Sequence, residues 1–213
     1  MLFFTGVIVA AHLPLLLLHA ENLWDKPHYQ FFPIVLVGAG FLAYNRWPGL
    51  GVLTPGAAWI CYPLVALVAL LLMTATVAGS PSLGAVTFLL TLAVLLYGLG
   101  GRALLVRMLP AWVLLWLAVP PPFGLDRALI TRMQLFTARW SSVVLDMANV
   151  PHVIQGAVVE VPEKQLFVEE ACSGIHSLFA TLCCTLFFVF WARIPVLRSI
   201  LLLISAEIGR AHV

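Results

Sequence analysis

Long apolar runs separated by short polar turns constrain this chain more than any other feature of its sequence. The runs lie near residues 1–20, 31–45, 52–78, 83–99, 103–119, 171–191 and from 196 onward. A helix needs about 20 mostly apolar residues to cross a hydrocarbon core about 30 Å thick. Because 62% of the residues are hydrophobic and 9% are charged, the chain cannot cover a water-facing surface. We predict an all-α, polytopic transmembrane helix bundle of about seven spans that forms a single domain over residues 1–213.

Arginines in the short turns indicate the orientation of the spans, because Lys and Arg favour the cytoplasmic side. The turns that carry them contain Arg46, then Arg102 and Arg107, then Arg193 and Arg198. We predict that these three turns are cytoplasmic. The loop 21–30, the turn 79–82 and the stretch after residue 122 then lie outside. Glycines in the apolar runs are expected to allow helices to approach closely. They are Gly38, Gly40, Gly98, Gly100 and Gly101.

The segment 125–148 is long enough to cross the membrane but is amphipathic. Its apolar residues recur at helical spacing; they are Leu125, Leu129, Met133, Phe136, Trp140, Val144 and Met147. Three arginines lie between them. This pattern favours one amphipathic helix in the membrane interface or packed on the bundle. If the segment instead crossed, Arg193 and Arg198 would lie outside, against the positive-inside rule.

Residues 151–168 differ from the rest of the chain, since valines alternate there with Gln155, Glu160, Glu163 and Lys164. Gly156 and the residues around Pro162 supply turn signals. We therefore predict a small, β-like extracytoplasmic flap that leads the chain to residue 172.

The residues that indicate chemistry lie at the start of the next apolar run, in Val168–Leu178. Cys172 is there close to a predicted helix N-terminus, where unpaired N–H groups and the helix dipole favour the nucleophilic thiolate. The same N–H groups can hold an oxyanion during acyl transfer. Glu169 and Glu170 would raise the pKa of the thiol, so a nearby cation is needed to offset them.

The run Glu170–Ile175, followed by Ser177 and Leu178, resembles the signature of the exosortase and archaeosortase family. The resemblance implies a multi-pass cysteine peptidase and transpeptidase of the cytoplasmic (inner) membrane, with Cys172 as nucleophile. Its substrates would be exported proteins with a C-terminal sorting signal, a Pro-Glu-Pro-like motif followed by a membrane helix and a basic tail. Cleavage would occur at the outer face. The family also needs an arginine and a histidine from later helices.

Two departures from the family pattern concern His176 and the C-terminus. His176 stands where the family has another polar residue, often arginine. It lies four residues after Cys172 and so on the same helical face. It could act as an auxiliary base in a Cys-His pair or simply line the cavity. The final residues, 207–213, can be encoded by a common sequencing-adapter string. We interpret them as a non-native tail, expect the catalytic Arg and His beyond residue 206, and expect this truncated form to be inactive.

Other classes of function are weaker interpretations of the sequence. The basic residues are scattered and the net charge is only +2, which gives no footprint for nucleic acid. No metal-ligand or disulfide spacing is present, so we expect no metal and no cofactor. Cys61, Cys183 and Cys184 are interpreted as packing residues. The alternative is a non-enzymatic polytopic membrane protein, either a transporter or an assembly subunit. The oligomeric state stays open.

Overall fold

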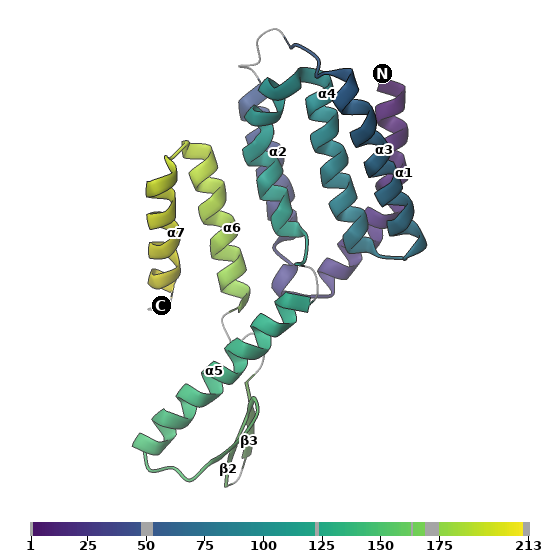
Figure 1. Cartoon of the computed structure of the whole chain (residues 1–213). Coiled ribbons are helices and arrows are strands. Elements are labelled where there is room, and N and C mark those ends of the chain that lie inside the picture. Colours follow the sequence, from purple (N-terminus) through teal and green to yellow (C-terminus); the bar gives the residue numbers. More distant parts are fainter. Residues whose placement is uncertain (1, 48–52, 122–123, 163, 169–174, 211–213) are drawn as a thin grey trace. The chain divides into compact units, whose positions relative to one another are not determined.

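The computed structural model describes residues 2–47, 53–121, 124–162, 164–168 and 175–210. Its helices are α1 (Leu2–Trp24), α2 (Phe32–Arg46), α3 (Ala58–Val77), α4 (Pro81–Leu115), α5 (Leu125–Met147), α6 (Ile175–Ala192) and α7 (Val196–Arg210), with short 3₁₀ turns at Pro27–Tyr29 and Trp116–Ala118 (Figure 1). Each apolar run of the sequence therefore lies in or overlaps a helix.

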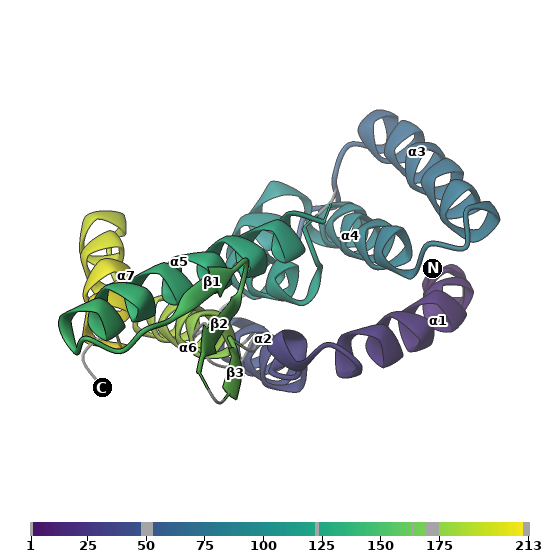
Figure 2. The same ribbon diagram turned by 90° about the horizontal axis from the view of Figure 1, so that it is seen from below.

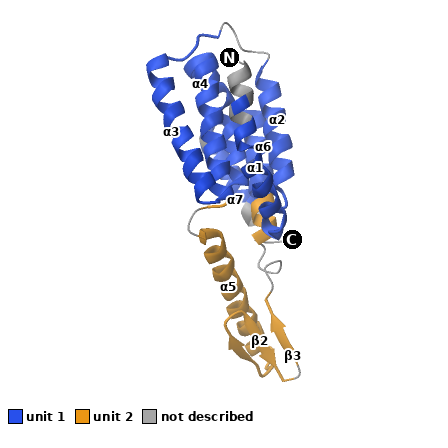
Figure 3. Cartoon of the chain, turned by 90° about the vertical axis from the view of Figure 1, so that its right-hand side faces the viewer, with its two compact units in different colours: residues 1–119, 181–213 blue, residues 120–180 orange. Residues whose placement is uncertain are grey.

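Within the described residues, three helical stretches are long and apolar enough to cross a membrane. They are Ala58–Val77, Pro81–Ala118 and Ile175–Ala192. The structure is thus that of a mostly helical membrane protein with one small sheet, while the total of about seven spans stays a prediction. The chain divides into two compact units, residues 1–119 with 181–213 and residues 120–180 (Figure 3).

Helix α4 is the centre of the first unit, because it packs against α1, α2 and α3. Figure 2 shows α3 beside α4. A buried core joins α2, α4 and α6 and consists of Val35, Ala39, Leu42, Ala111, Leu114 and Cys183. A Cβ on Gly38 would lie 3.1 Å from Phe187 and 3.3 Å from Leu114. The small residue therefore lets α2 approach its neighbours, as predicted, whereas Gly40 has nothing within 4 Å and plays no such part.

Helix α4 folds back on itself at Gly100 and Gly101. Both have non-helical backbone angles, and Gly101 has φ 61° and ψ −156°. The indole Nε1 of Trp112 donates a hydrogen bond to the carbonyl of Leu89 at 2.8 Å, although a straight helix would place these residues about 35 Å apart. The two halves of α4, 81–99 and 102–115, are therefore antiparallel. The turn lies between the spans predicted at 83–99 and 103–119.

Two of the turn arginines lie at one end of the first unit and cap helix ends. Arg46 donates from Nη2 to the carbonyl of Phe190 at 2.8 Å and from Nη1 to that of Arg107 at 3.5 Å. Arg107 Nε donates to the carbonyl of Arg46 at 2.7 Å. The carbonyls of Arg46 and Phe190 are in the last turns of α2 and α6, where carbonyls lack intrahelical partners and attract cations. These bonds bring together the end of α2, the start of the second half of α4 and the end of α6.

The second unit consists of α5 and a three-stranded antiparallel sheet, which confirms that residues 151–168 form strands. The strands are β1 (Val153–Gln155), β2 (Val158–Val161) and β3 (Lys164–Phe167), in that order. Val153 pairs with Glu160, and Val159 pairs with Leu166. Gly156, with φ +63°, makes the first hairpin turn. Strands β1 and β2 contact α5.

Helix α5 presents the apolar face that its sequence pattern predicts. Most of that face is exposed, namely Leu125, Leu129, Phe136, Trp140, Val144 and Met147. Asp126, Ile130 and Ala138 are buried. An exposed stripe of this size suits contact with lipid, and the position of α5 in the membrane interface stays a prediction.

Candidate functional site

The predicted nucleophile Cys172 lies outside the described residues, together with Glu169, Glu170 and Gly174. The predicted pairing of Cys172 with His176 is therefore untested and stays a prediction. What the structure describes is the pair of chain segments on either side of this motif, both within the second unit.

Both flanks of the motif are anchored. On the N-terminal side, the N–H of Val168 donates to the carbonyl of Ala157 at 2.9 Å. The side-chain amide of Gln134 on α5 donates to the carbonyl of Val168 at 3.1 Å. On the C-terminal side, Ile175 begins α6 and is fully buried. Cys172 therefore lies in sequence between two residues held by the second unit, Val168 and Ile175.

Gln134 is a positioning residue that the sequence analysis missed. It lies midway between the buried residues Ile130 and Ala138, four residues from each and so on the same helical face. An uncharged polar residue in a buried stripe usually has a hydrogen-bond partner. The sequence pattern put the apolar face of this helix on other residues, so neither the burial of this stripe nor the partner of Gln134, 34 residues away, was predictable from the sequence.

His176 is half-buried near the start of α6. Its Nε2 is buried and has no hydrogen-bond partner among the described residues. A buried nitrogen without a hydrogen-bond partner costs about 1–3 kcal/mol. In the neutral tautomer with the proton on Nδ1, the Nε2 lone pair can accept a proton from a thiol.

A second polar group in the same unit has the composition of a hydrolase triad but not its geometry. His152 Nε2 bonds to the hydroxyl of Ser142, and its Nδ1 bonds to the carbonyl of Val150 at 2.9 Å. The carboxylate of Asp146 is 4.0 Å from Nδ1, too far for a hydrogen bond. Nδ1 donates to a main-chain carbonyl and not to the carboxylate, so the triad is incomplete, and the two bonds of His152 join α5 to the segment that follows it.

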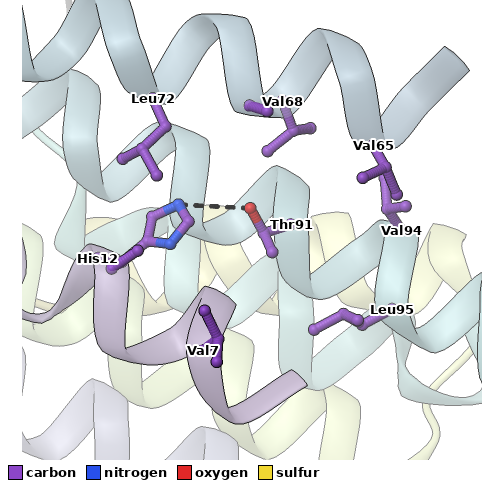
Figure 4. A pocket seen from close by; sticks show the side chains of 10 residues that line it. Val7, His12, Val65, Val68, Leu72, Thr91, Val94 and Leu95 are labelled. Carbon is purple, nitrogen blue, oxygen red and sulfur yellow. Dashed lines mark hydrogen bonds between the residues drawn. The ribbon is translucent and has the colours of Figure 1, made fainter. Parts of the chain in front are cut away.

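The first unit holds polar side chains in apolar cavities. A cavity of about 150 Å³ is lined by apolar residues of α1, α3 and α4 together with His12 and Thr91 (Figure 4). The Thr91 hydroxyl donates to the carbonyl of Thr87 at 2.8 Å, so its single proton is used. It therefore accepts from His12 Nε2 at 3.4 Å. This bond satisfies a buried imidazole nitrogen between helices.

His19 lies in a separate cavity of about 190 Å³ in the same unit. Its Nε2 bonds to the carbonyl of Ala118 at 2.9 Å, which joins α1 to the 3₁₀ turn that follows α4. The described cysteines, Cys61, Cys183 and Cys184, are free thiols. Within the described ranges, no group of three or more His, Cys, Asp or Glu could hold a metal ion.

Comparison with known proteins gives one family. The family model described as transmembrane exosortase (Exosortase_EpsH) matches residues 23–209, most of the chain. No curated protein and no solved structure matches.

Proposed function

The chain belongs to the transmembrane exosortase family, and we propose that it is a membrane cysteine transpeptidase that cleaves the C-terminal sorting signals of exported proteins. The observation that carries this proposal is the position of Cys172 in sequence. It follows the anchored residue Val168 and precedes the first residue of the apolar helix α6, Ile175. A thiol close to a helix N-terminus is favoured as the thiolate.

In the proposed reaction, the Cys172 thiolate attacks the scissile carbonyl of the sorting signal, and a new C–S bond forms. The C–N bond then breaks, and the leaving amine takes a proton from a general acid. The product is a thioester between Cys172 and the exported protein. An acceptor nucleophile, or water, attacks the thioester carbonyl and releases the thiolate. N–H groups or a cation would stabilise the oxyanion in both steps.

His176 is the described group best suited to assist this thiol. It lies four residues after Cys172, and its buried Nε2 has no described partner. It would take the thiol proton and thereby hold a thiolate–imidazolium pair. The turn arginines are unsuitable, since α6 has 18 residues and is therefore about 27 Å long. Arg46 contacts Phe190, and Arg193 follows Ala192, so both lie at the opposite end of α6 from Cys172.

The proposed topology puts the active thiol at the outer face of the inner membrane. Its support is the arginine distribution, which favours the far end of α6 as the cytoplasmic end. Helix α5 would lie in the outer interface on its exposed apolar face, with the sheet facing the exterior. About seven spans and exported proteins as partners belong to the same proposal.

Thiol labelling tests the position of Cys172 without requiring turnover. Single-cysteine variants that retain only Cys172, Cys183 or Cys184 are treated in intact cells with a membrane-impermeant maleimide. Rapid modification is expected at Cys172 only, because Cys183 is buried in the helix core and Cys184 is exposed in the middle of the apolar helix α6, where lipid would shield it from the reagent. His176→Gln should slow the reaction near neutral pH and shift its profile to higher pH. Labelling of Cys172 only after the membrane is opened would refute the outer location.

Cleavage of a reporter protein with a Pro-Glu-Pro-like sorting signal tests the chemistry. The parent for this test is a form of the chain that processes the reporter, extended with the expected Arg and His if the 213 residues alone do not. In that parent, Cys172→Ala should abolish both processing and the thioester intermediate, whereas the matched variant Cys184→Ala should process normally. Unchanged processing by Cys172→Ala would eliminate the proposed nucleophile.

A further inference from the structure

The end of the first unit at which Arg46 caps α6 gathers positive charge. The arginine cluster consists of Arg46, Arg107 and Arg193, and the charges of Arg107 and Arg193 both repel Arg46. Arg193 is exposed and its side chain has no hydrogen-bond or ion-pair partner in the described part of the chain. Like charges that gather in this way are stabilised when an anion binds between them.

Two carboxylates of this unit, those of Glu21 and Asp25, lie at its other end. Glu21 and Asp25 are at and just beyond the end of α1, the end that His19 joins to Ala118. Ala118 is separated from Arg107 by most of the second half of α4, about 16 Å along a helix. The arginine cluster is therefore not neutralised by them.

An apolar groove runs along the same helices toward the arginine cluster. It has a volume of about 350 Å³ and lies between α2, α6 and the end of α4, with Gly38, Phe41, Leu114, Cys184 and Phe187 among its walls. We call it the α2–α6 groove. The rings of Phe41 and Phe187 are 5.9 Å apart. Its lining is almost entirely apolar, so it suits a hydrocarbon chain and not a polar ligand.

The groove and the cluster are aligned end to end. Phe41 precedes Arg46 by five residues, about 7.5 Å along α2, and Phe187 precedes Phe190 by three residues, about 4.5 Å along α6. Phe190 is the residue whose carbonyl Arg46 binds. A single molecule with an apolar chain in the groove can therefore place its polar head on the arginines.

We propose that the arginine cluster and the α2–α6 groove together form a binding site for one anionic phospholipid. Its phosphate lies on the guanidinium groups, with Arg193 as the exposed contact, and one acyl chain lies against Phe41 and Phe187. Basic pockets between helices on the cytoplasmic side are a known kind of site for anionic head groups. The positive-inside rule puts this end in the cytoplasmic leaflet, so the lipid bridges α2, α4 and α6 at the end opposite Cys172.

The test compares lipids on the full 213-residue chain purified in detergent. Native mass spectrometry and thermal unfolding are measured with phosphatidylglycerol, with phosphatidylcholine of the same acyl chains, and with glycerol phosphate, which has a head group but no chain. Phosphatidylglycerol is expected to bind in a 1:1 adduct and raise the melting temperature more than phosphatidylcholine. Glycerol phosphate should give neither effect. Equal effects of the two phospholipids, or a full effect of glycerol phosphate, would overturn the proposal.

Two variants separate the head-group contact from the groove. Arg193 has φ +53°, a conformation that Asn tolerates, so Arg193→Asn removes the charge without straining the turn. It should weaken phosphatidylglycerol binding about fivefold. The matched control Arg139→Gln removes an exposed arginine from α5 and should leave binding unchanged. Cys184→Phe fills the groove wall and should weaken phosphatidylglycerol binding too. Equal losses in Arg193→Asn and Arg139→Gln would show that only net charge matters, which contradicts the site.

Discussion

The turn inside α4 depends on Gly101. We therefore expect Gly101→Ala to destabilise the first unit. Gly101 has φ 61° and ψ −156°, a region of backbone space that is essentially restricted to glycine. A Cβ at this position would also lie 2.8 Å from the main-chain carbonyl oxygen of Thr54. A carbonyl oxygen cannot move aside as a flexible side chain can, so the backbone itself has to shift.

The loss of stability in Gly101→Ala has two contributions, the unfavourable backbone conformation and the clash with the Thr54 carbonyl. A residue other than glycine in this conformation costs about 1–3 kcal/mol, and the forced backbone shift adds about 1 kcal/mol or more. We therefore expect Gly101→Ala to lower the free energy of unfolding by about 2–4 kcal/mol.

Gly98→Ala is the matched control, because it makes the same chemical change three residues earlier. A Cβ there would meet only Cys61 Sγ at 3.8 Å, an ordinary van der Waals distance. Since Ala is a better helix former than Gly, this variant should be neutral or more stable by about 0.5–1 kcal/mol.

Unfolding of both variants is measured by circular dichroism as sodium dodecyl sulfate is added to the protein in dodecyl maltoside. The expected pattern is a midpoint well below that of the unaltered chain for Gly101→Ala and a midpoint at or above it for Gly98→Ala. If the free energies of unfolding of the two variants differ by less than about 0.5 kcal/mol, an alanine at position 101 is not strained by this backbone conformation. That result would refute the reasoning.

Two further predictions concern the second unit. Gln134→Leu removes the hydrogen bond to Val168 and should destabilise the sheet by about 1 kcal/mol. The hydrogen-exchange rate of the β3 amides should therefore rise about fivefold. An unchanged rate would show that Gln134 does not stabilise the sheet. Ser142→Ala and His152→Phe should each cost about 0.5–1.5 kcal/mol, with a coupling energy of similar size in a double-mutant cycle. Strict additivity in that cycle would mean that the Ser142–His152 bond does not contribute to stability.

The position of each helix was predictable because it depends on a local property. Apolar runs of sufficient length cannot remain in water, and their main-chain groups must be satisfied inside the segment, so each run becomes a helix. In the described residues, α1 to α7 lie where the runs and the amphipathic segment 125–148 predict helices, and the runs 83–99 and 103–119 form the two halves of α4. The alternating valines of 151–168 likewise indicated strands, because alternation is itself a local pattern.

The contacts between segments were not predictable in the same way. The arginines were interpreted as markers of orientation, yet Arg46 also binds the carbonyl of Phe190, 144 residues away. Gly101 was expected to permit close helix approach, and it instead forms the turn that reverses α4. The bond of Gln134 to Val168 also joins distant residues. Each depends on which helices pack together.

By itself, the sequence determined that this protein is a membrane-embedded helical chain with a small sheet, and its Cys172 motif indicated the family that the comparison then showed. Only the tertiary structure decided how α4 reverses, which carbonyls the arginines cap, and that an apolar groove leads to them. The physical reason is that periodicity and hydropathy act within a segment, whereas capping, close approach and cavities depend on the distance between atoms that are far apart in the chain.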